Sequence, residues 1–129
     1  MTAAVLDASA IIALLKGERG ASKVAAVIAD ATVAAINHAE VVSHFAYLGA
    51  PIEEIRIMLG TLPYTVVVAD ETLAWEAGAL RAITSSSRLC LGVRFCLALA
   101  RRLSVPAYTA DRAWKDVAAD SGVKVVAIR

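Results

Sequence analysis

Short apolar runs alternate with longer segments along this 129-residue chain. Five of them are rich in Val or Ile: AAVL (3–6), TVAAI (32–36), TVVV (65–68), VPAYT (105–109) and VKVVAI (123–128). Such runs are typical of strands buried on both faces, and the segments between them are long enough for crossover helices. The alternation predicts an α/β fold with a five-stranded, mainly parallel sheet flanked by helices. We expect residues 1–129 to form a single domain, because a chain of this size can bury one good core.

Several residues between the runs predict where helices begin and end. Pro51 suits the first helical position of PIEEIRIMLG, and Gly60 suits its C-terminus. Asn37, followed three residues later by Glu40, predicts a capping box at the start of NHAEVVSHFAYLG. The serine-rich segment 85–88 predicts a mobile loop. Further helices are expected in ASAIIALLKG, ASKVAAVIAD, DETLAWEAGALRAI, CLGVRFCLALARRL and DRAWKDVAADSG.

The composition narrows the class of protein. A chain with 59% hydrophobic and 19% charged residues is not disordered, and it leaves apolar surface for a protein partner or a second copy. The N-terminal run MTAAVLDASAIIALLKG has no basic leader and carries Asp7, so we expect a soluble cytoplasmic protein. Cys90 and Cys96 match neither a redox pair nor a zinc spacing, and we expect both to be reduced core residues.

The second half of the chain is basic, although the formal net charge is only +1. Between positions 81 and 115 a single acid, Asp111, stands against seven basic residues: Arg81, Arg88, Arg94, Arg101, Arg102, Arg112 and Lys115. This asymmetry permits a polyanionic partner such as a nucleic acid without proving one.

Acidic residues follow four of the predicted strands. Asp7 comes after the first, Glu40 after the second, Asp70 after the third and Asp111 after the fourth. Each of them has a simple role near a helix start, as a cap or part of a capping box. The carboxyl ends of parallel strands also meet at one edge of a sheet, where several carboxylates repel each other and attract a cation. Oxygen ligands favour Mg²⁺ or Mn²⁺.

Other kinds of α/β site have less support. The chain contains neither GxGxxG nor GxxxxGK[ST], the motifs of dinucleotide and P-loop sites. His38 and His44 are six apart, which is wrong for two ligands on one helix face, so we expect surface or packing roles. Asp7 has no second acid two residues on, which argues against an aspartyl-phosphate phosphatase. A phospho-receiver domain remains open because Asp70 follows the third strand, although the usual acidic pair and lysine are missing.

Four motifs, in order along the chain, resemble those of PIN domains. They are VLDASAIIALL, NHAEVVSHF, LCLGVRFCLALARRL and PAYTADRAW, and they are most similar to the VapC toxins of bacterial type II toxin-antitoxin systems. The resemblance covers essentially the whole chain. It implies a strand order of 3-2-1-4-5 and an endoribonuclease that uses Mg²⁺ or Mn²⁺ to activate water and cleave structured RNA.

The resemblance also implies partners. Similar toxins act on tRNA or ribosomal RNA, form homodimers and are held in check by a small VapB-like antitoxin. The apolar segments ASKVAAVIAD and PIEEIRIMLG are candidate surfaces for the antitoxin, although packing on the sheet must account for most of their apolar residues.

The family's acidic residues map onto Asp7, Glu40 and Asp111, which are the implied catalytic metal ligands. Its remaining acid lies in a Gly-Asp-Arg sequence, and here that sequence reads Gly92-Val93-Arg94. Val93 therefore stands at the position of an expected catalytic aspartate. Residues that could support the site or contact RNA are Ser9, Arg94, Thr109 and Asp116.

Val93 admits two interpretations. At helical spacing it continues a core stripe with Cys96, Leu97 and Ala100. In the family context, an isopropyl group cannot bind a cation, so we expect activity far below that of a chain with aspartate there. Either the change inactivates an otherwise intact toxin, or the chain is a degenerate copy that binds RNA or an antitoxin without hydrolysis.

Overall fold

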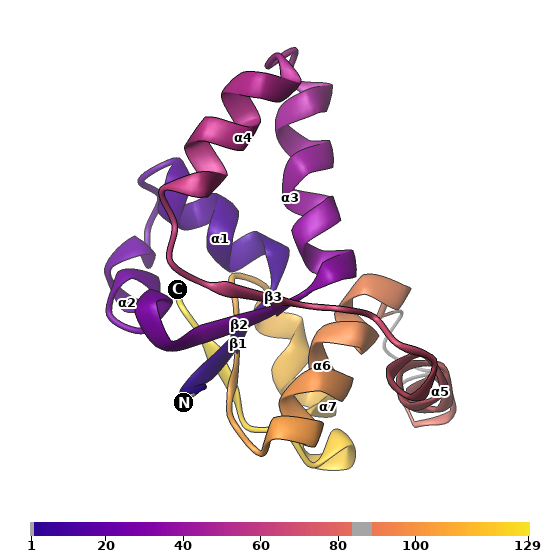
Figure 1. Ribbon diagram of the computed structural model, residues 1–129. Helices are drawn as coiled ribbons and strands as arrows, with labels where there is room; N and C mark the ends of the chain where they lie inside the picture. Colours follow the sequence, from indigo (N-terminus) through magenta and orange to yellow (C-terminus); the bar gives the residue numbers. More distant parts are fainter. Residues whose placement is uncertain (1, 84–88) are drawn as a thin grey trace.

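The computed structural model describes residues 2–83 and 89–129, so the loop expected at 85–88 lies outside the described residues. Its strands are β1 (Ala4–Leu6), β2 (Ala31–Ala34), β3 (Thr65–Val67), β4 (Ala107–Thr109) and β5 (Val125–Ala127). All neighbouring strands are parallel, in the order β3-β2-β1-β4-β5. Figure 1 labels β1, β2 and β3 of this sheet. The predicted fold class and strand order are confirmed.

The central strand is β1, between β2 and β4. Val5 pairs with Thr32 on one side and with Ala107 on the other. The ladder continues past the end of the strand, because the Asp7 backbone N–H donates to the carbonyl of Tyr108 at 3.0 Å. Chain connections diverge between β1 and β4, and ligands of open α/β sheets bind at such a point. Asp7 therefore lies at the switch point of the sheet.

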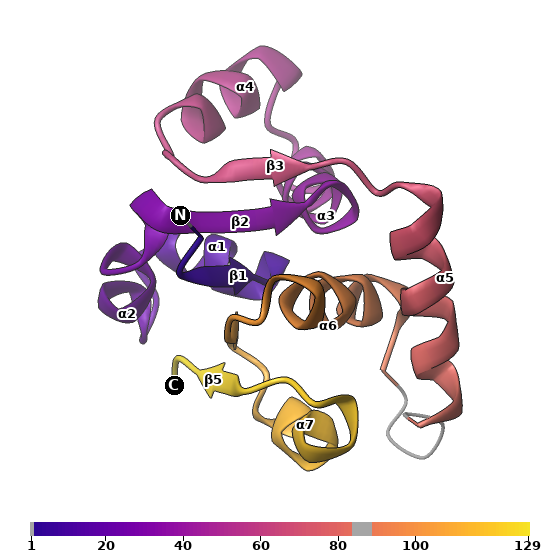
Figure 2. The ribbon, with the colours of Figure 1, turned by 60° about the horizontal axis from the view of Figure 1, so that its bottom comes forward.

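Helices connect the strands and cover the sheet. They are α1 (Ala8–Leu15), α2 (Ala21–Ala25), α3 (Ala35–Tyr47), α4 (Ile52–Gly60), α5 (Glu71–Ala79), α6 (Leu91–Leu103) and α7 (Lys115–Ser121), with short 3₁₀ turns at Ile28–Asp30, Leu80–Ala82 and Arg112–Trp114. Figure 1 shows α3 and α4 projecting from the sheet as a pair. Figures 1 and 2 both show α6 between the sheet and α5.

Consecutive residues of β1 pack into two separate apolar clusters, one on each face of the sheet. Val5 joins the cluster that includes Leu97 of α6 and the buried Trp114. Leu6 joins the other cluster, with Ile11 of α1. Successive strand residues point to opposite faces, so both faces of the central sheet are covered, as an α/β layer arrangement requires.

The edge strand β3 departs from the sequence prediction. Thr65 and Val66 are exposed, and Val68 just beyond the strand is 75% exposed. The expectation that this run is buried on both faces is wrong, because an edge strand has one neighbouring strand, here β2, and less cover.

Helix boundaries also differ from those predicted. Pro51 is the N-cap of α4 rather than its first residue, and Gly60 is the last helical residue rather than the stop beyond it. Helix α3 begins at Ala35, so Asn37 lies inside its first turn and the predicted capping box with Glu40 is wrong. Alanine is the best helix former, which accounts for the earlier start.

Two further expectations change. The segment ASKVAAVIAD is not one helix, because only α2 and the turn Ile28–Asp30 form there. Cys90 is exposed at the N-cap of α6, so only Cys96 is a core cysteine. No helix in the described part of the chain is long and apolar enough to cross a membrane.

Candidate active site

Asp7 is buried at the end of the central strand, where it caps α1 as predicted. The hydroxyl of Ser9 donates to Asp7 Oδ2 at 2.5 Å, and that of Thr109 donates to the same oxygen at 3.2 Å. Burial raises the pKa of Asp7 above its ordinary value of 3.8, while the hydrogen bonds from Ser9 and Thr109 lower it. The Asp7 carboxylate is thus largely withdrawn from water and held by two hydroxyls.

These two hydroxyls also join the ends of β1 and β4. Ser9 Oγ accepts the backbone N–H of Ala110 at 3.0 Å, and Thr109 Oγ1 accepts that of Asp111 at 3.1 Å. The two hydroxyl oxygens are 3.2 Å apart. Ser9 and Thr109, which the sequence suggested as supporting residues, therefore touch Asp7 directly and fix the backbone that leads to Asp111.

Glu40, on α3, is held against α6. Asn37 Nδ2 donates to Glu40 Oε1 at 2.9 Å and to the carbonyl of Gly92 at 2.9 Å. A Cβ atom on Gly92 would lie 2.5 Å from Glu40 Oε2 and 2.6 Å from Oε1, which no real contact allows. The missing side chain at position 92 therefore makes room for the carboxylate. Sequence reasoning assigned Asn37 to a cap and missed this contact.

Asp7 and Glu40 form one electrostatic site beside α6. Burial is the main cause of the raised pKa of Asp7, and the charge of Glu40 raises it further. Burial also raises the pKa of the Cys96 thiol well above its usual value, and the charges of both acids add to this effect. Cys96 is three residues after Val93 and four after Gly92, so the three positions share a face of α6. The acid pair lies close to that face.

Val93 is half-buried and packs against the apolar cluster that contains Cys96, Leu97 and Ala100. The predicted core stripe is confirmed. Because position 93 lies on the face of α6 that carries Cys96, an aspartate there would bring another carboxylate towards Asp7 and Glu40. The isopropyl group brings none.

The other acids face elsewhere. Asp111 is exposed and caps the turn Arg112–Trp114, where its Oδ1 accepts the N–H of Ala113 at 2.9 Å. It is joined to Asp7 through Thr109. Asp116 is exposed in the first turn of α7. The structure thus couples Asp7 to Glu40 and places Asp111 at the margin of the pair.

Asp70 does not occupy a receiver-like position. In the flavodoxin-like order 2-1-3-4-5, typical of receivers, the third strand is central, whereas β3 here is at the edge. Asp70 caps α5 through the N–H of Leu73, and Arg102 donates to both of its carboxylate oxygens at 3.2 and 3.3 Å. The phospho-receiver hypothesis is therefore wrong for this fold.

The acid pair suits a hard divalent cation in kind but supplies few ligands. Its donors are carboxylate oxygens, and neither Asp7 nor Glu40 forms an ion pair with a described basic residue. Within residues 2–83 and 89–129, no three His, Cys, Asp or Glu side chains are arranged to hold a metal ion. Mg²⁺ is often held by one or two carboxylates together with water and substrate phosphates. The residues present therefore fit a weak site for Mg²⁺ or Mn²⁺.

Several basic residues of the second half already have partners. Arg94 donates to the carbonyl of Ala77 at 3.4 Å, so it braces α6 against α5 rather than a carboxylate. Arg102 pairs with Asp70.

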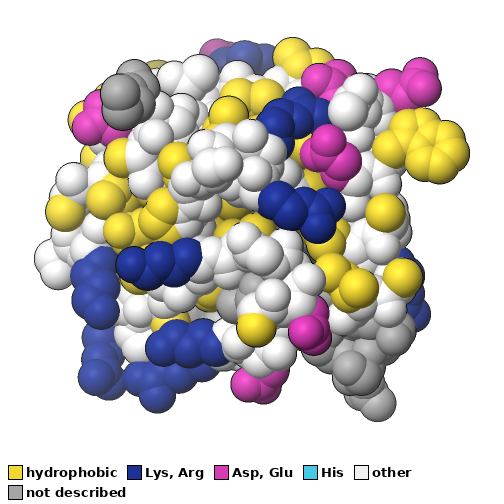
Figure 3. Space-filling view, turned by 90° about the horizontal axis from the view of Figure 1, so that it is seen from below, with side chains coloured by type: hydrophobic (Ala, Val, Ile, Leu, Met, Phe, Trp, Pro, Cys, Tyr) yellow, Lys and Arg dark blue, Asp and Glu magenta, His cyan; other side chains and the backbone are white. Residues whose placement is uncertain are grey.

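A hollow of about 470 Å³ before β4 and β5, at the sheet edge opposite Asp7, is lined by Arg101 and Lys124 among others. Seen from below, Lys and Arg side chains gather at the lower left of the molecule (Figure 3).

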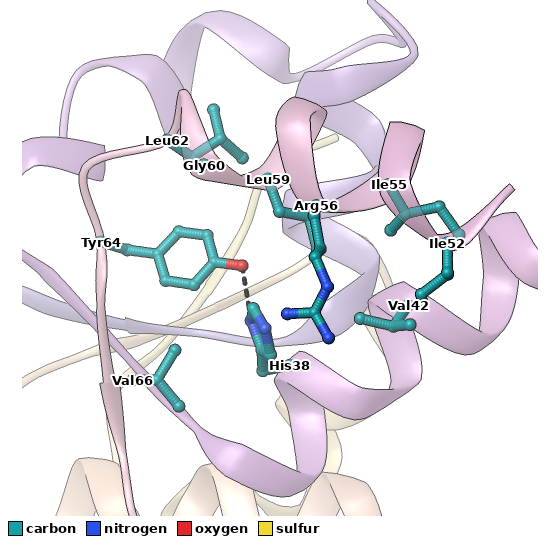
Figure 4. A pocket seen from close by; sticks show the side chains of 10 residues that line it. All are labelled: His38, Val42, Ile52, Ile55, Arg56, Leu59, Gly60, Leu62, Tyr64 and Val66. Carbon is teal, nitrogen blue, oxygen red and sulfur yellow. Dashed lines mark hydrogen bonds between the residues drawn. The ribbon is translucent and has the colours of Figure 1, made fainter. Parts of the chain in front are cut away.

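A second hollow lies between α3, α4 and β3 (Figure 4). It has a volume of about 400 Å³ and mostly aliphatic walls. His38 Nδ1 and the Tyr64 hydroxyl are 2.8 Å apart in a hydrogen bond, and burial raises the pKa of Tyr64 to about 12. His44 packs edge-on against Phe45. The packing roles expected for His38 and His44 agree with these contacts.

Comparison with known proteins is informative for the fold. The structure is similar to a toxin–antitoxin complex from Klebsiella pneumoniae, with 23% identity over 98% of each chain and a TM-score of 0.74. It is also similar to DNA-bound VapBC from Salmonella typhimurium (14% identity over 100% of each chain, TM-score 0.78) and to FitAcB from Neisseria gonorrhoeae (18% over 97% of each, TM-score 0.77). No curated protein sequence matches. The PIN domain model matches residues 4–120, and with the acid pair at the switch point of a 3-2-1-4-5 sheet this chain belongs to the PIN domain family.

Proposed function

We propose that this protein is a VapC-like endoribonuclease that depends on Mg²⁺ or Mn²⁺ and is weakened by Val93. The observation that carries the proposal is the coupled pair of Asp7 and Glu40 at the switch point, beside the face of α6 that bears position 93. Membership of the PIN domain family supports nuclease chemistry at this pair.

Each residue of the site has a separate task in this proposal. Asp7 and Glu40 would hold the divalent ion, which when bound would supply Lewis-acid chemistry for hydrolysis. Asp111 completes the acidic set from the margin. Ser9 and Thr109 keep the Asp7 carboxylate oriented, as hydrogen-bonded outer residues commonly do. With Val93 in place of an acid, two inward carboxylates remain and we expect the ion to be held loosely.

Structured RNA of the tRNA or ribosomal RNA class is the proposed substrate. The basic second half supports this, since Arg and Lys side chains follow RNA phosphates. Arg101 is exposed and lines the hollow before β4 and β5, but this hollow is at the sheet edge opposite Asp7, so Arg101 is available to RNA only at a distance from the acid pair. Arg94 and Arg102 are engaged within the protein and contribute less.

A VapB-like antitoxin and a second copy of the chain are the proposed protein partners, in the cytoplasm. The similar structures from Klebsiella and Salmonella are complexes of toxin with antitoxin, which supports the first. Of the two apolar segments expected to contact an antitoxin, α4 offers the larger exposed side chains, Ile52 at 51% and Ile57 at 72%. Tyr47 and Leu48, at the end of α3, extend this apolar surface.

The alternative function is a binding module that engages RNA or an antitoxin without hydrolysis. Val93 favours it, because the side chain is well packed and contributes no ligand. The two functions agree on partners and differ only in whether an acid at position 93 creates a nuclease.

One variant separates them. We expect Val93→Asp to gain Mg²⁺- or Mn²⁺-dependent cleavage of a structured RNA by about 100-fold or more, the scale of a lost electrostatic group in an active site. Val93→Asn is the matched control, because asparagine has the shape of aspartate without its charge. This variant should gain far less cleavage activity. Metal titrations of the parent and both variants, with RNA present, measure the effect. Absence of cleavage by a folded Val93→Asp chain at saturating metal would favour the binding module.

A further inference from the structure

We propose that Asn37 is a positioning residue, which fixes the Glu40 carboxylate against the first turn of α6 in space left by Gly92. The inference rests on the proposed function, because it assigns Asn37 a task towards Glu40 within that site. Sequence reasoning placed Asn37 in a helix cap, and the structure removes that explanation.

The geometry of Asn37 is determined by its two hydrogen bonds. The side chain is fully buried, and its Nδ2 donates to both Glu40 Oε1 and the carbonyl of Gly92. An amide nitrogen carries two hydrogens, so both are used. Turning the amide over would place Oδ1 against two acceptors, which fixes its orientation.

The remaining atom of the amide argues for a functional role. Asn37 Oδ1 is buried without a hydrogen-bond partner among the described residues. A buried carbonyl oxygen in this state costs stability, and an apolar side chain of similar size would avoid that cost. Asn37 is therefore poorly explained as a residue that only holds α3 to α6.

Gly92 completes the arrangement from the other side. Any Cβ at position 92 would overlap the Glu40 carboxylate, with contacts of 2.5 to 2.7 Å to its atoms. A glutamate side chain has several rotatable bonds, and the amide on one side and the bare backbone on the other restrict where its carboxylate can lie. Two substitutions, at positions 37 and 92, thus disturb the same carboxylate through different atoms.

The activity test uses the Val93→Asp chain. Asn37→Leu should lower Mn²⁺ affinity in calorimetry by about 10- to 100-fold, as loss of outer-sphere support usually does, and lower kcat with little change in KM for RNA. Gly92→Ala should cause a similar loss with Asn37 intact, and the double variant should lose little more than either alone. Alanine is favourable within a helix, so Gly92→Ala is expected to fold.

Thr32→Val is the matched control. Thr32 is also buried, and its hydroxyl forms a hydrogen bond with that of Thr2 at 2.7 Å near the amino ends of β2 and β1, whereas Glu40 comes after the carboxyl end of β2. We expect it to alter thermal stability without altering Mn²⁺ affinity or kcat. If folded Asn37→Leu and Gly92→Ala chains bind Mn²⁺ and cleave RNA within about twofold of their parent, Asn37 does not position Glu40.

A second readout decides the inference even if Val93→Asp has no activity. In the parent chain, the side-chain amide protons of Asn37 should exchange slowly in NMR, and Glu40→Gln should shift their resonances. Thr32→Val should leave them in place. Resonances unmoved by Glu40→Gln would overturn the positioning role, whereas inactivity of Val93→Asp alone would count against the nuclease.

Discussion

Asp7 and Asp70 occupy the same local sequence context in two different regions of the molecule. Each follows a short apolar strand and caps the next helix through its side chain. Asp7 is only 7% exposed, and burial raises its pKa, whereas the Asp70 side chain is 52% exposed, and a hydrogen bond from Arg102 lowers its pKa. The same local pattern therefore gives one buried carboxylate with a raised pKa and one exposed carboxylate with a lowered pKa.

The difference follows from the strand order. β1 has a neighbour on each side, so Asp7 receives the hydroxyl of Thr109 from β4 and feels the charge of Glu40 from the helix after β2. β3 has one neighbour, and Asp70 points to a surface where Arg102 is its partner. The chemistry open to a strand-end aspartate is thus set by what lies beside its strand.

The largest contrast is expected in catalysis. In the Val93→Asp chain, Asp7→Asn should lower the rate of RNA cleavage by about 100- to 1000-fold, because it removes a charge from the site. Asp70→Asn should change the rate by less than about twofold, since Asn caps a helix nearly as well and lies outside the site. Single-turnover cleavage at saturating Mg²⁺ measures both. Equal losses from the two variants would contradict the assignment of the site to β1.

The hydroxyl two residues after each aspartate gives the next contrast. Ser9→Ala should lower the free energy of unfolding by about 1–3 kcal/mol, because Asp7 Oδ2 loses a donor and the N–H of Ala110 loses its acceptor. Thr72→Ala, at the same offset from Asp70, should change it by about 0.5 kcal/mol or less, since Thr72 is exposed. Urea denaturation of both variants tests this order.

The pH dependence of stability should have opposite signs in the two regions. The stability linked to Asp7 is fully present below its ordinary pKa of 3.8 and is lost as pH rises through the raised folded value. The stability linked to Asp70 is present above 3.8 and is lost as pH falls through its lowered value.

Metal-free denaturation curves across pH 2 to 8, for the parent, Asp7→Asn and Asp70→Asn, check these signs. The free energy of unfolding of Asp7→Asn should increase relative to that of the parent as pH rises towards neutrality, because the amide does not ionise. If instead the parent becomes more stable relative to Asp7→Asn over that range, burial does not control the pKa of this carboxylate.

The smallest effect is expected at the exposed ion pair. Arg102→Gln should shift the unfolding midpoint by about 2 °C or less, since exposed pairs contribute little. The shift should shrink further at high salt, which screens such pairs. A large loss would mean that Arg102 supports the packing of α5 on α6 rather than the charge of Asp70.

The sequence was sufficient for the sheet because periodicity and strand length are local properties. The runs around Val5, Val33 and Val126 fall in the observed strands, and Asp7 and Glu40, the acids after the first two runs, follow from chain order. The exposure of Val66 was not predictable in this way, because an edge strand and a central strand have similar apolar sequences. Strand order decides between them, and here it came from a family resemblance.

The site was predictable in part for the same reason. Asp7 and Glu40 were found because they follow central strands, but their coupling depends on α6, which is distant in sequence. The contact of Asn37 with Gly92 spans 55 residues and leaves only a weak signal in the sequence, a glycine in the first turn of a helix. The exposure of the Asp111 side chain was also not predictable, because an aspartate that caps a helix and one that binds a metal ion have the same sequence context.

Gly92 and Val93 are adjacent, yet substitution at each has a different consequence. A side chain at position 92 would displace the Glu40 carboxylate. Val93 packs against the apolar cluster and leaves the contact between Asn37 and Glu40 intact. Under the proposed function, exchange of one side chain at position 93 would silence or restore catalysis while the outer surfaces recognised by RNA or antitoxin keep their shape. A harmless form of the protein can then still compete for the partners of an active one.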